Sequence, residues 1–507
     1  MSDQAITRVV VVGGGTAGWM AAAALASLLD HRRREIVLVE SDEIGIVGVG
    51  EATIPPIMAY NAMLDINEDA FLAATKATFK LGIEFVDWGA PGERYFHPFG
   101  PYGQDFRGVH FHQLYLREAQ RRQLPDIAEW SMSAVAAGLG RFARPGPDAR
   151  LPLSQLGYAF HFDAGLYAQF LRRVAEGRGV QRIEGRIVDA ELDAESGHVR
   201  SLALADGRTI AGELFIDCSG FRGLLIEGKL ATGYEDWRQW LPCDRAVAAP
   251  CALAGPPDPF TRSTARAAGW QWRIPLQHRI GNGLVYSSAH LGREQAEDAL
   301  LASLEGEVLG EPRHLSFTAG RRRLAWNANV VSLGLSSGFI EPLESTSIHF
   351  IQSGIAKLLA LFPDRRFDPA ERAEYNRQMA EVFEDVRDFV ILHYHATRRS
   401  DSGFWNHCRT MALPDSLAAR LELWRSKGRL FREGRELFGT ASWVAVLLGQ
   451  GVRPEAVEPA AEAVDPALAA DALDKMRLSY RRMAETMPAH AEFIARACAA
   501  SPRPGAD

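Results

Sequence analysis

Apolar residues near the N-terminus predict a strand, a tight turn, a helix and a second strand. Four consecutive valines, Val9 to Val12, form a buried-strand pattern, and Met20 to Leu29 is rich in alanine and leucine, which favour helix. A second apolar run, Ile36 to Val39, ends in Glu40. This order predicts a βαβ unit whose strands are parallel.

Glycines occupy the turn between the first strand and the helix. Gly13, Gly15 and Gly18 have G-x-G-x-x-G spacing, with Thr16 and Ala17 between them. In a dinucleotide-binding unit this turn lets the pyrophosphate approach the helix N-terminus, and an acid about twenty residues later takes the ribose hydroxyls. Glu40 has that position. The glycines alone are a weak signal, but the whole arrangement indicates a site for an adenine dinucleotide.

A second informative stretch runs from residue 341 to 348 and combines carboxylates with a helix start. Apolar residues then recur at helical spacing, namely Ile348, Ile351, Ile355, Leu358 and Leu359. Ser345 is the predicted N-cap, which leaves the backbone amides of Thr346 and Ser347 free. Free amides at the positive end of a helix favour an anion, although an ordinary capped helix would show the same pattern.

The rest of the chain is interleaved rather than divided into consecutive modules. Residues 1–88 form the first part of the dinucleotide unit, and residues 89–150, rich in Pro, Gly and aromatic residues, are expected to be an inserted loop-rich segment. Strand patterns return in residues 151–225, which complete the dinucleotide unit. The remaining segments are strand-rich residues 226–319, residues 320–368 with the candidate anion site, and helical residues 369–507.

Charge and cysteine usage narrow the function classes. The 507-residue chain has a net charge of -7 and no basic patch, which argues against nucleic acid or a membrane surface as partner. Its five cysteines never form C-x-x-C, so no zinc or dithiol motif is present, and we expect no metal. No segment has the pattern of a signal peptide or membrane span, and a cytoplasmic location is expected.

Several short motifs, in order along the chain, carry a resemblance to a known family. They are residues 13–20 (GGGTAGWM), 48–53 (GVGEAT), Phe79-Lys80, 270–275 (WQWRIP) and 341–348 (EPLESTSI). Together they resemble the flavin-dependent tryptophan halogenases along nearly the whole chain. The resemblance implies an α/β fold in which a Rossmann-like FAD-binding module of the flavin monooxygenase type is interleaved with a mostly helical substrate-binding module.

The resemblance also implies a two-component reaction. A separate flavin reductase supplies reduced FAD, and reduced FAD, O2 and chloride or bromide give hypohalous acid, which halogenates an electron-rich arene such as indole, tryptophan or a derivative. The halide would bind the amides of Thr346 and Ser347; many relatives have glycine in place of Ser347, but this contact uses only backbone. Positions that match flavin-lining residues are Ala52, Val188, Leu335 and Ile348.

Lys80 and Glu344 match the family's two catalytic residues. Lys80 would receive the hypohalous acid, either as an ammonium that donates a hydrogen bond or as an amine that forms a haloamine. A single lysine is more often a solvated surface charge, but Lys80 is predicted at the turn before the strand 81–86, which favours a fixed position. Glu344 would take the proton of the arenium intermediate. By spacing alone Glu341 could serve equally well, and only the family register selects Glu344.

Trp270 and Trp272 alternate with polar residues, so both indoles should face one side of a strand. The resemblance implies that they block direct access of substrate to the flavin. A plain aromatic core pair would give the same alternation, and the following Ile274 and Pro275 favour the family interpretation.

Other short motifs carry weaker signals. Residues 334–338 match the G-x-S-x-G of serine hydrolases, but an N-terminal dinucleotide unit does not begin that fold. The histidines His97, His110, His112, His161, His393 and His395 are interpreted as core, loop or helix residues. Two rival functions remain, a flavin-dependent hydroxylase and a flavin-binding protein without chemistry. The hydroxylase would lack W-x-W-x-I-P and have no need of Lys80, and the retention of Lys80 with Glu344 argues against the inactive protein.

The substrate region departs from family members that act on free tryptophan. Their late clamp contains tyrosines and a carboxylate, whereas residues 437–451 here contain neither. Indole, a substituted indole or another electron-rich arene, free or presented on a peptide or carrier, is therefore favoured over free tryptophan. The expected partners are this small aromatic substrate and the reductase, and a homodimer is one candidate assembly.

Overall fold

The computed structural model describes residues 4–29, 33–43, 50–432, 434 and 436–500. A six-stranded sheet forms its nucleotide-binding half, in the order β20 (Trp326–Asn327), β21 (Val330–Ser332), β12 (Leu214–Asp217), β1 (Arg8–Val12), β2 (Glu35–Glu40) and β8 (Gln181–Glu184). All its neighbours are parallel except the β20 and β21 pair. The predicted strand, helix and strand are confirmed, because β1 is followed by α1 (Thr16–Leu28) and pairs with β2.

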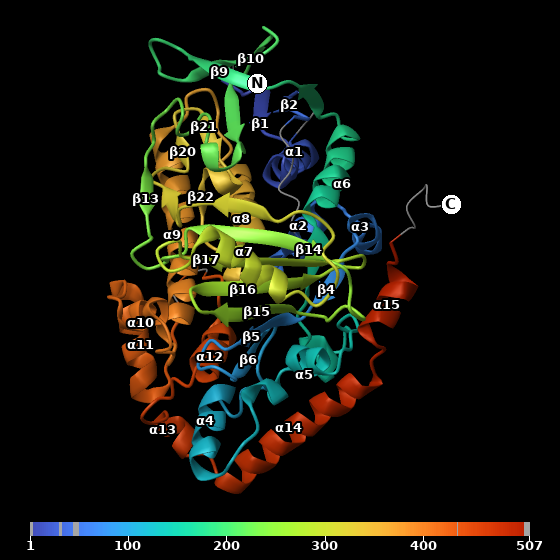
Figure 1. Cartoon of the computed structure of the whole chain (residues 1–507), viewed down its shortest axis with the longest axis vertical. Helices are drawn as coiled ribbons and strands as arrows, with labels where there is room; N and C mark the ends of the chain where they lie inside the picture. Colours follow the sequence, from blue (N-terminus) through green and yellow to red (C-terminus); the bar gives the residue numbers. More distant parts are fainter. Residues whose placement is uncertain (1–3, 30–32, 44–49, 433, 435, 501–507) are drawn as a thin grey trace.

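Both faces of this sheet are covered. Helix α1 packs against α6 (Ala164–Glu176) and α8 (Ser347–Ala360) on one face, where Val9 and Val11 point. On the other face Val10 and Val12 pack against a small sheet of β9 (Ile187–Leu192), β10 (Val199–Leu204) and β11 (Thr209–Ala211). Figure 1 shows this small sheet at the end of the molecule where the chain begins. The valine run is therefore buried on both faces, as the sequence predicted.

A seven-stranded, mostly antiparallel sheet forms the centre of the molecule. Its order is β18 (Arg313–Ser316), β14 (Arg245–Cys251), β17 (Ile280–Tyr286), β16 (Gly269–Pro275), β15 (Thr261–Arg266), β5 (Gly82–Val86) and β6 (Arg94–Pro98). Strands β15 and β5 are parallel, which joins an early segment of the chain to a late one. In this sheet β15 alone separates the W-x-W-x-I-P strand β16 from β5, the strand that follows Lys80.

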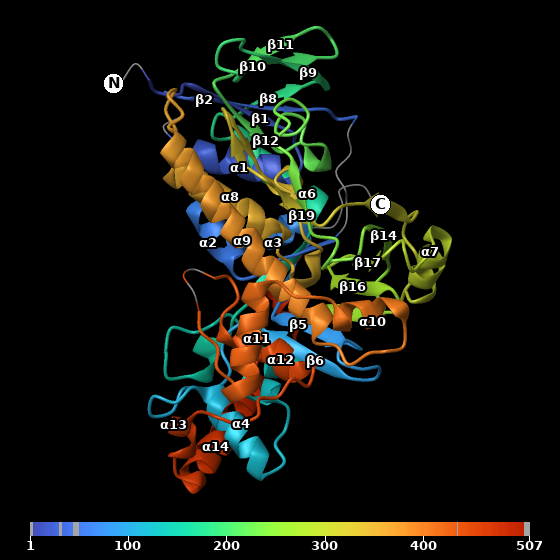
Figure 2. The same cartoon turned by 90° about the vertical axis from the view of Figure 1, so that its left-hand side faces the viewer.

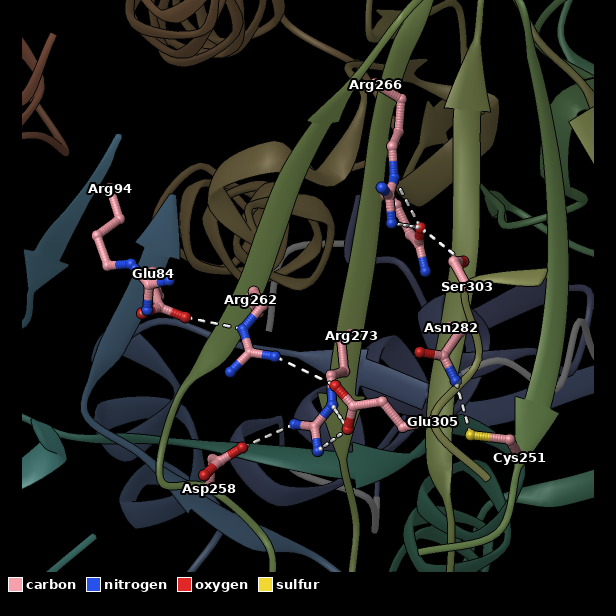
Figure 3. Close-up of polar contacts among 11 residues, drawn as sticks. Glu84, Arg94, Cys251, Asp258, Arg262, Arg266, Arg273, Asn282, Ser303 and Glu305 are labelled. Atoms are coloured by element: carbon pink, nitrogen blue, oxygen red, sulfur yellow. Dashed lines mark hydrogen bonds and ion pairs between the residues drawn. The ribbon is translucent and has the colours of Figure 1, made fainter. Parts of the chain in front are cut away.

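The outer face of this sheet carries a network of ion pairs (Figure 3). Glu84 accepts hydrogen bonds from Arg94 and Arg262, and Arg262 also reaches Glu305. Arg273 of β16 connects Glu305, at 2.9 Å, to Asp258, at 2.8 Å. Because side chains alternate along a strand, the tryptophans of β16 point to the opposite, inner face.

Short sheets and helices complete the structure. The remaining strands form two small sheets, β3 (Gly50–Ala52), β7 (Ala159–Asp163) and β4 (Thr78–Lys80), and β13 (Tyr234–Asp236), β19 (Gly320–Arg322) and β22 (Gly338–Phe339). The remaining helices before residue 303 are α2 (Pro56–Met63), α3 (Glu68–Thr75), α4 (Phe111–Arg121), α5 (Met132–Gly138) and α7 (Arg293–Ala302), with 3₁₀ turns at Ile127–Trp130, Pro152–Gln155 and Gly220–Arg222. Residues 89–150, expected to be loop-rich, thus contain a strand and two α-helices.

The C-terminal part is helical, as predicted. Its helices are α9 (Pro369–His395), α10 (Gly403–Thr410), α11 (Asp415–Lys427), α12 (Thr440–Gly449), α13 (Pro459–Glu462), α14 (Pro466–Thr486) and α15 (His490–Ala497). The 27-residue α9 runs from beside α8 down to α10 and α11, near the middle of the molecule (Figure 2). It therefore connects the nucleotide-binding half to the helical half. Within the described ranges, no helix is both long and apolar enough to cross a bilayer.

Candidate active site

The glycine turn after β1 has the shape that a bound dinucleotide requires. Gly13 has a φ of +103°, and a Cβ there would lie 2.6 Å from the carbonyl oxygen of Cys218. Gly15 differs, because no described atom lies within 4 Å of a Cβ added to it. Gly15 is also the N-cap of α1 and offers no side-chain cap to the first amides of that helix. The turn therefore has open space beside uncapped amides, which fits a pyrophosphate.

Two of the other predicted flavin-side residues, Glu40 and Leu335, lie close to this turn. Glu40 ends β2 beside Gly14, and its carboxylate accepts a hydrogen bond from Arg182 Nε at 2.5 Å. Leu335 lies in the 3₁₀ turn Gly334–Ser336, which contacts Ala17 through Gly334.

Three further residues were predicted to line the flavin. Ile348 is buried in the first turn of α8, and Ala52 is buried in β3. Val188 is 55% exposed in β9, beyond the end of β8. Gly48 and Val49 of the second motif lie outside the described residues.

The predicted anion site lies at the N-terminus of α8, but its cap differs from the sequence prediction. The helix begins at Ser347, and Thr346, not Ser345, is the N-cap. Ser345 has a left-handed backbone with a φ of +61°, which turns its hydroxyl away from the helix and toward Lys80. Thr346 makes no side-chain cap bond. The amides at this helix start are therefore uncapped by a side chain, as an anion site requires.

Lys80 is fully buried at the end of β4, not in a turn before the next strand. Its Nζ donates to the carbonyl oxygen of Thr53 at 3.0 Å and to Ser345 Oγ at 2.7 Å, and lies 5.1 Å from the ring centre of Phe99. Burial lowers the pKa of Lys80 to about 7, although the charge of Glu344 acts in the opposite direction. Lys80 is therefore a positioned amine poised between its two protonation states near neutral pH.

Glu344 is fully buried between two histidines. His97, on β6, places Nδ1 at 3.0 and 2.9 Å from the two carboxylate oxygens, and His393, on α9, places Nε2 at 2.7 Å from Oε1. Burial by itself would raise the pKa of this carboxyl, but the two histidines lower it to about 2. Glu344 is therefore held ionised in a site without water contact.

The contacts of His393 also locate a proton. Its Nδ1 lies 2.8 Å from the carbonyl oxygen of Phe389, which can only accept, so Nδ1 carries a hydrogen. The other ring nitrogen, Nε2, lies 2.7 Å from Glu344 Oε1. The bond from Nδ1 to the backbone therefore fixes the orientation of the ring that faces Glu344.

Glu341 is a second buried carboxylate, with different partners. Its Oε2 accepts from Trp270 Nε1 at 2.7 Å and from the Tyr394 hydroxyl at 2.5 Å. Its Oε1 has no hydrogen-bond partner among the described residues. Burial raises the pKa of Glu341 to about 7, although both hydrogen bonds lower it. Of the two carboxylates, Glu344 is the one whose charge acts on Lys80, which favours the family register.

Several of these contacts had no sequence signal. His97 and His393 were interpreted as core, loop or helix residues, and neither spacing nor composition connects them to Glu344, about 250 and 50 residues away along the chain. Tyr394 was also missed. Ser336 of the G-x-S-x-G stretch is buried, and its hydroxyl donates to the carbonyl oxygen of Leu333 at 2.8 Å. Because this hydroxyl is buried and donates to the backbone, Ser336 is not an exposed nucleophile, which argues against the hydrolase interpretation.

Trp270 and Trp272 do lie side by side, with ring centres 6.1 Å apart. Both are buried, and a Cβ on Gly283 of the neighbouring strand would lie 2.2 Å from the Trp272 ring. Glycine at this position therefore makes room for an indole. Within the described residues, no group of three or more histidine, cysteine or acidic side chains could hold a metal ion.

Comparison with known proteins connects this geometry to a family. The sequence profile described as "Tryptophan halogenase" matches residues 8–466. The chain belongs to the tryptophan halogenase family. It is therefore a flavin-dependent enzyme with an α/β fold that contains a Rossmann-like FAD-binding unit, and the predicted family, fold class and enzyme class are confirmed.

Individual halogenases show how far the likeness extends. Tryptophan 6-halogenase SttH from Streptomyces toxytricini is 36% identical over 520 residues, which cover 96% of this chain and 98% of SttH. The structure of Xcc4156, a flavin-dependent halogenase from Xanthomonas campestris, matches with a TM-score of 0.95 and 49% identity, over 99% of this chain and 100% of Xcc4156. BrvH, a flavin-dependent halogenase from Brevundimonas sp. BAL3, matches with a TM-score of 0.93 and 48% identity, over 97% of this chain and 99% of BrvH.

Proposed function

We propose that this halogenase is a two-component enzyme that halogenates an electron-rich, indole-type arene through Lys80 and Glu344. The observation that carries the proposal is the placement of both side chains in one buried site, where Lys80 Nζ lies 2.7 Å from the hydroxyl of Ser345, the residue that follows Glu344. Reduced FAD, delivered by a separate reductase, supplies hypohalous acid from O2 and chloride or bromide when bound at the glycine turn.

The residues around the turn hold the other components. Gly13, Gly15, Thr16, Ala17 and Gly18 form the pyrophosphate site, and Glu40 takes the adenine ribose. Ala52, Val188, Leu335 and Ile348 line the flavin. The uncapped amides of Thr346 and Ser347 bind the halide at the positive end of α8.

Lys80 then directs the halogen to the arene. As an ammonium it donates a hydrogen bond to the hypohalous acid, and as an amine it exchanges a proton for the halogen and releases water. In either route a carbon–halogen bond forms and the bond of the halogen to oxygen or nitrogen breaks. The ring then loses a proton to Glu344, whose low pKa keeps it ionised and ready to accept.

Aromatic side chains beside the site favour an uncharged arene. Phe438 stacks on Phe389 with ring centres 3.9 Å apart, and both rings lie near His97. The guanidinium of Arg420 lies over the Trp443 ring and pairs with Glu436. Indole or a substituted indole fits the stacked rings of Phe389 and Phe438 better than free tryptophan, which brings two charges.

The direct test is incubation with a flavin reductase, NADH, FAD, bromide and a panel of indoles and phenols. Mass spectrometry should show the equal-intensity isotope pair of a monobrominated product. An oxygenated product without bromine would support the hydroxylase alternative, and no product from any arene, despite hypobromous acid formation, would contradict the proposed function.

The FAD site has its own test. Gly15→Trp should abolish FAD binding, because the indole would fill the open space beside the α1 amides. Gly138→Trp is the matched control, since a Cβ at Gly138 also meets no described atom within 4 Å, at the end of α5. Unchanged FAD affinity in the Gly15 variant would place the pyrophosphate elsewhere.

A further inference from the structure

Two buried carboxylates lie at the two ends of one short turn. Glu341 precedes, and Glu344 ends, the 3₁₀ turn Pro342–Glu344, and Ser345 follows with its left-handed backbone. Both side chains are fully buried. The turn therefore sets the positions of Glu344, of the Lys80 partner Ser345 and of the start of α8.

The same two parts of the molecule hold both carboxylates. Consecutive residues of α9 reach them, His393 toward Glu344 and Tyr394 toward Glu341. The seven-stranded sheet supplies the other contacts, His97 of β6 to Glu344 and Trp270 of β16 to Glu341. The turn is thus fixed between a helix and a sheet: each of its two carboxylates contacts one residue of α9 and one residue of the seven-stranded sheet.

Trp270, the first tryptophan of W-x-W-x-I-P, makes a hydrogen bond to Glu341 that Trp272 does not make. An indole has one polar hydrogen, and that of Trp270 is directed at Glu341 Oε2 at 2.7 Å. Trp272, two residues along and on the same side, differs because its Nε1 has no hydrogen-bond partner among the described residues. A purely shielding role would require only the ring. It would not require a polar hydrogen aimed at a buried acid.

Resting on the proposed function, we propose that Trp270 and Tyr394 are positioning residues, which act through Glu341 to fix the turn that carries Glu344 and Ser345. The two donors converge on one oxygen, and this fixes the direction of the Glu341 side chain. Because Pro342 restricts the backbone that follows, a fixed Glu341 passes its position on to Glu344. Among the described residues, no hydrogen bond joins Trp270 or Tyr394 to Lys80 or Glu344.

The activity test uses ring-preserving variants. Trp270→Phe keeps an aromatic ring but removes the indole hydrogen, and should lower the brominated arene formed per hypobromous acid by about fivefold or more. Trp272→Phe removes a hydrogen without a described partner and should lower this ratio by less than half. Arg273→Gln, on the outer face of β16, should leave it unchanged. An equal loss in both tryptophan variants, or none in Trp270→Phe, would overturn the proposal.

A conservative variant and a double variant distinguish a positioning role of Trp270 and Tyr394 from a general loss of the fold. Glu341→Gln keeps an acceptor for both donors, so it should retain several times more activity than Glu341→Ala. Tyr394→Phe should behave like Trp270→Phe. In the Glu341→Ala background, Trp270→Phe should cause no further loss, because its partner is already gone. Full additivity there would show that Trp270 acts by another route.

A measurement without turnover keeps this proposal separate from the proposed function. The indole nitrogen–proton signals of 15N-tryptophan-labelled protein can be assigned for Trp270 and Trp272 with the two phenylalanine variants. Glu341→Ala should move the Trp270 signal upfield by loss of its hydrogen bond, and leave the Trp272 signal in place. If the Trp270 signal does not move, the positioning proposal fails even when halogenation is found. If it moves while no arene is halogenated, only the proposed function fails.

Discussion

The two faces of strand β16 differ in their polar contacts: one carries ion pairs that reach solvent, and the other donates a hydrogen bond to a buried carboxylate. On the outer face Arg273, whose side chain is 14% exposed, pairs with Asp258 and Glu305, which reach solvent with 36% and 41% of their side chains exposed. On the inner face Trp270 donates to Glu341, which is fully buried. A solvent-exposed ion pair is worth about 0–1 kcal/mol, whereas burying a carboxylate costs several kcal/mol before its partners offset it. The outer network can therefore be changed at little cost, and the buried acids have to serve chemistry or positioning.

The largest effect should come from Lys80. Lys80→Ala removes the group that receives the hypohalous acid, and should lower specific arene halogenation by about 100-fold or more, in the range that a positioned acid or base contributes. FAD binding and hypohalous acid release should persist, because Lys80 acts after the flavin chemistry. Product analysis and a trapping assay for hypohalous acid measure the two steps. Near-normal halogenation would mean that the oxidant reaches the arene by free diffusion or through another residue.

Glu344→Gln should have the next largest effect. The amide keeps the shape of the side chain but removes the charge that accepts the ring proton, so halogenation should fall by about tenfold or more. Glu341→Gln should be milder, since an amide still accepts from Trp270 and Tyr394. Steady-state halogenation of the same arene compares the two variants. The opposite ranking would make Glu341 the catalytic base and shift the site by one helical turn.

The pH profile should change near neutrality because the pKa of Lys80 is about 7. If the ammonium donates to the oxidant, halogenation falls as pH rises through 7; if the amine forms a haloamine, it rises. Residual activity of Lys80→Arg should lack this inflection, since arginine stays charged. Glu341→Gln should keep it, which separates Lys80 from Glu341, a buried carboxyl whose pKa is also about 7. A flat wild-type profile between pH 6 and 8.5 would contradict the assignment to Lys80.

The free energy of unfolding should depend on pH because Glu341 is buried. The pKa of Glu341 is raised from 4.5 to about 7, so the folded state binds the extra proton between these values, and its stability falls as pH rises through this window. Relative to Glu341→Gln, the wild-type free energy of unfolding should fall by up to ~3 kcal/mol between pH 4.5 and 8. Chemical denaturation of both proteins across this pH range measures the difference. A constant difference would show that folding does not raise the pKa of Glu341.

The sequence predicted the elements better than the contacts between them. The valine run, the glycine turn and Glu40 were placed correctly because periodicity and turn chemistry are local. Ser345 was wrongly predicted as the N-cap, because its preference for helix starts was overridden by a left-handed backbone and the hydrogen bond from Lys80. His97 and His393 could not be predicted as partners of Glu344, since the contacts arise only when β6, α9 and the turn pack together.

The smallest effect should come from the outer face of β16. Arg273→Gln breaks the pairs with Asp258 and Glu305, but both acids remain close to water, so the free energy of unfolding should change by at most ~1 kcal/mol. Halogenation should stay within about twofold of wild type, because the inner face is unchanged. Denaturant unfolding and product analysis measure both quantities. Since Arg273 and Trp270 lie on the same strand, a loss in Arg273→Gln as large as in Trp270→Phe would mean that the strand as a whole, and not its indole hydrogen, positions Glu341.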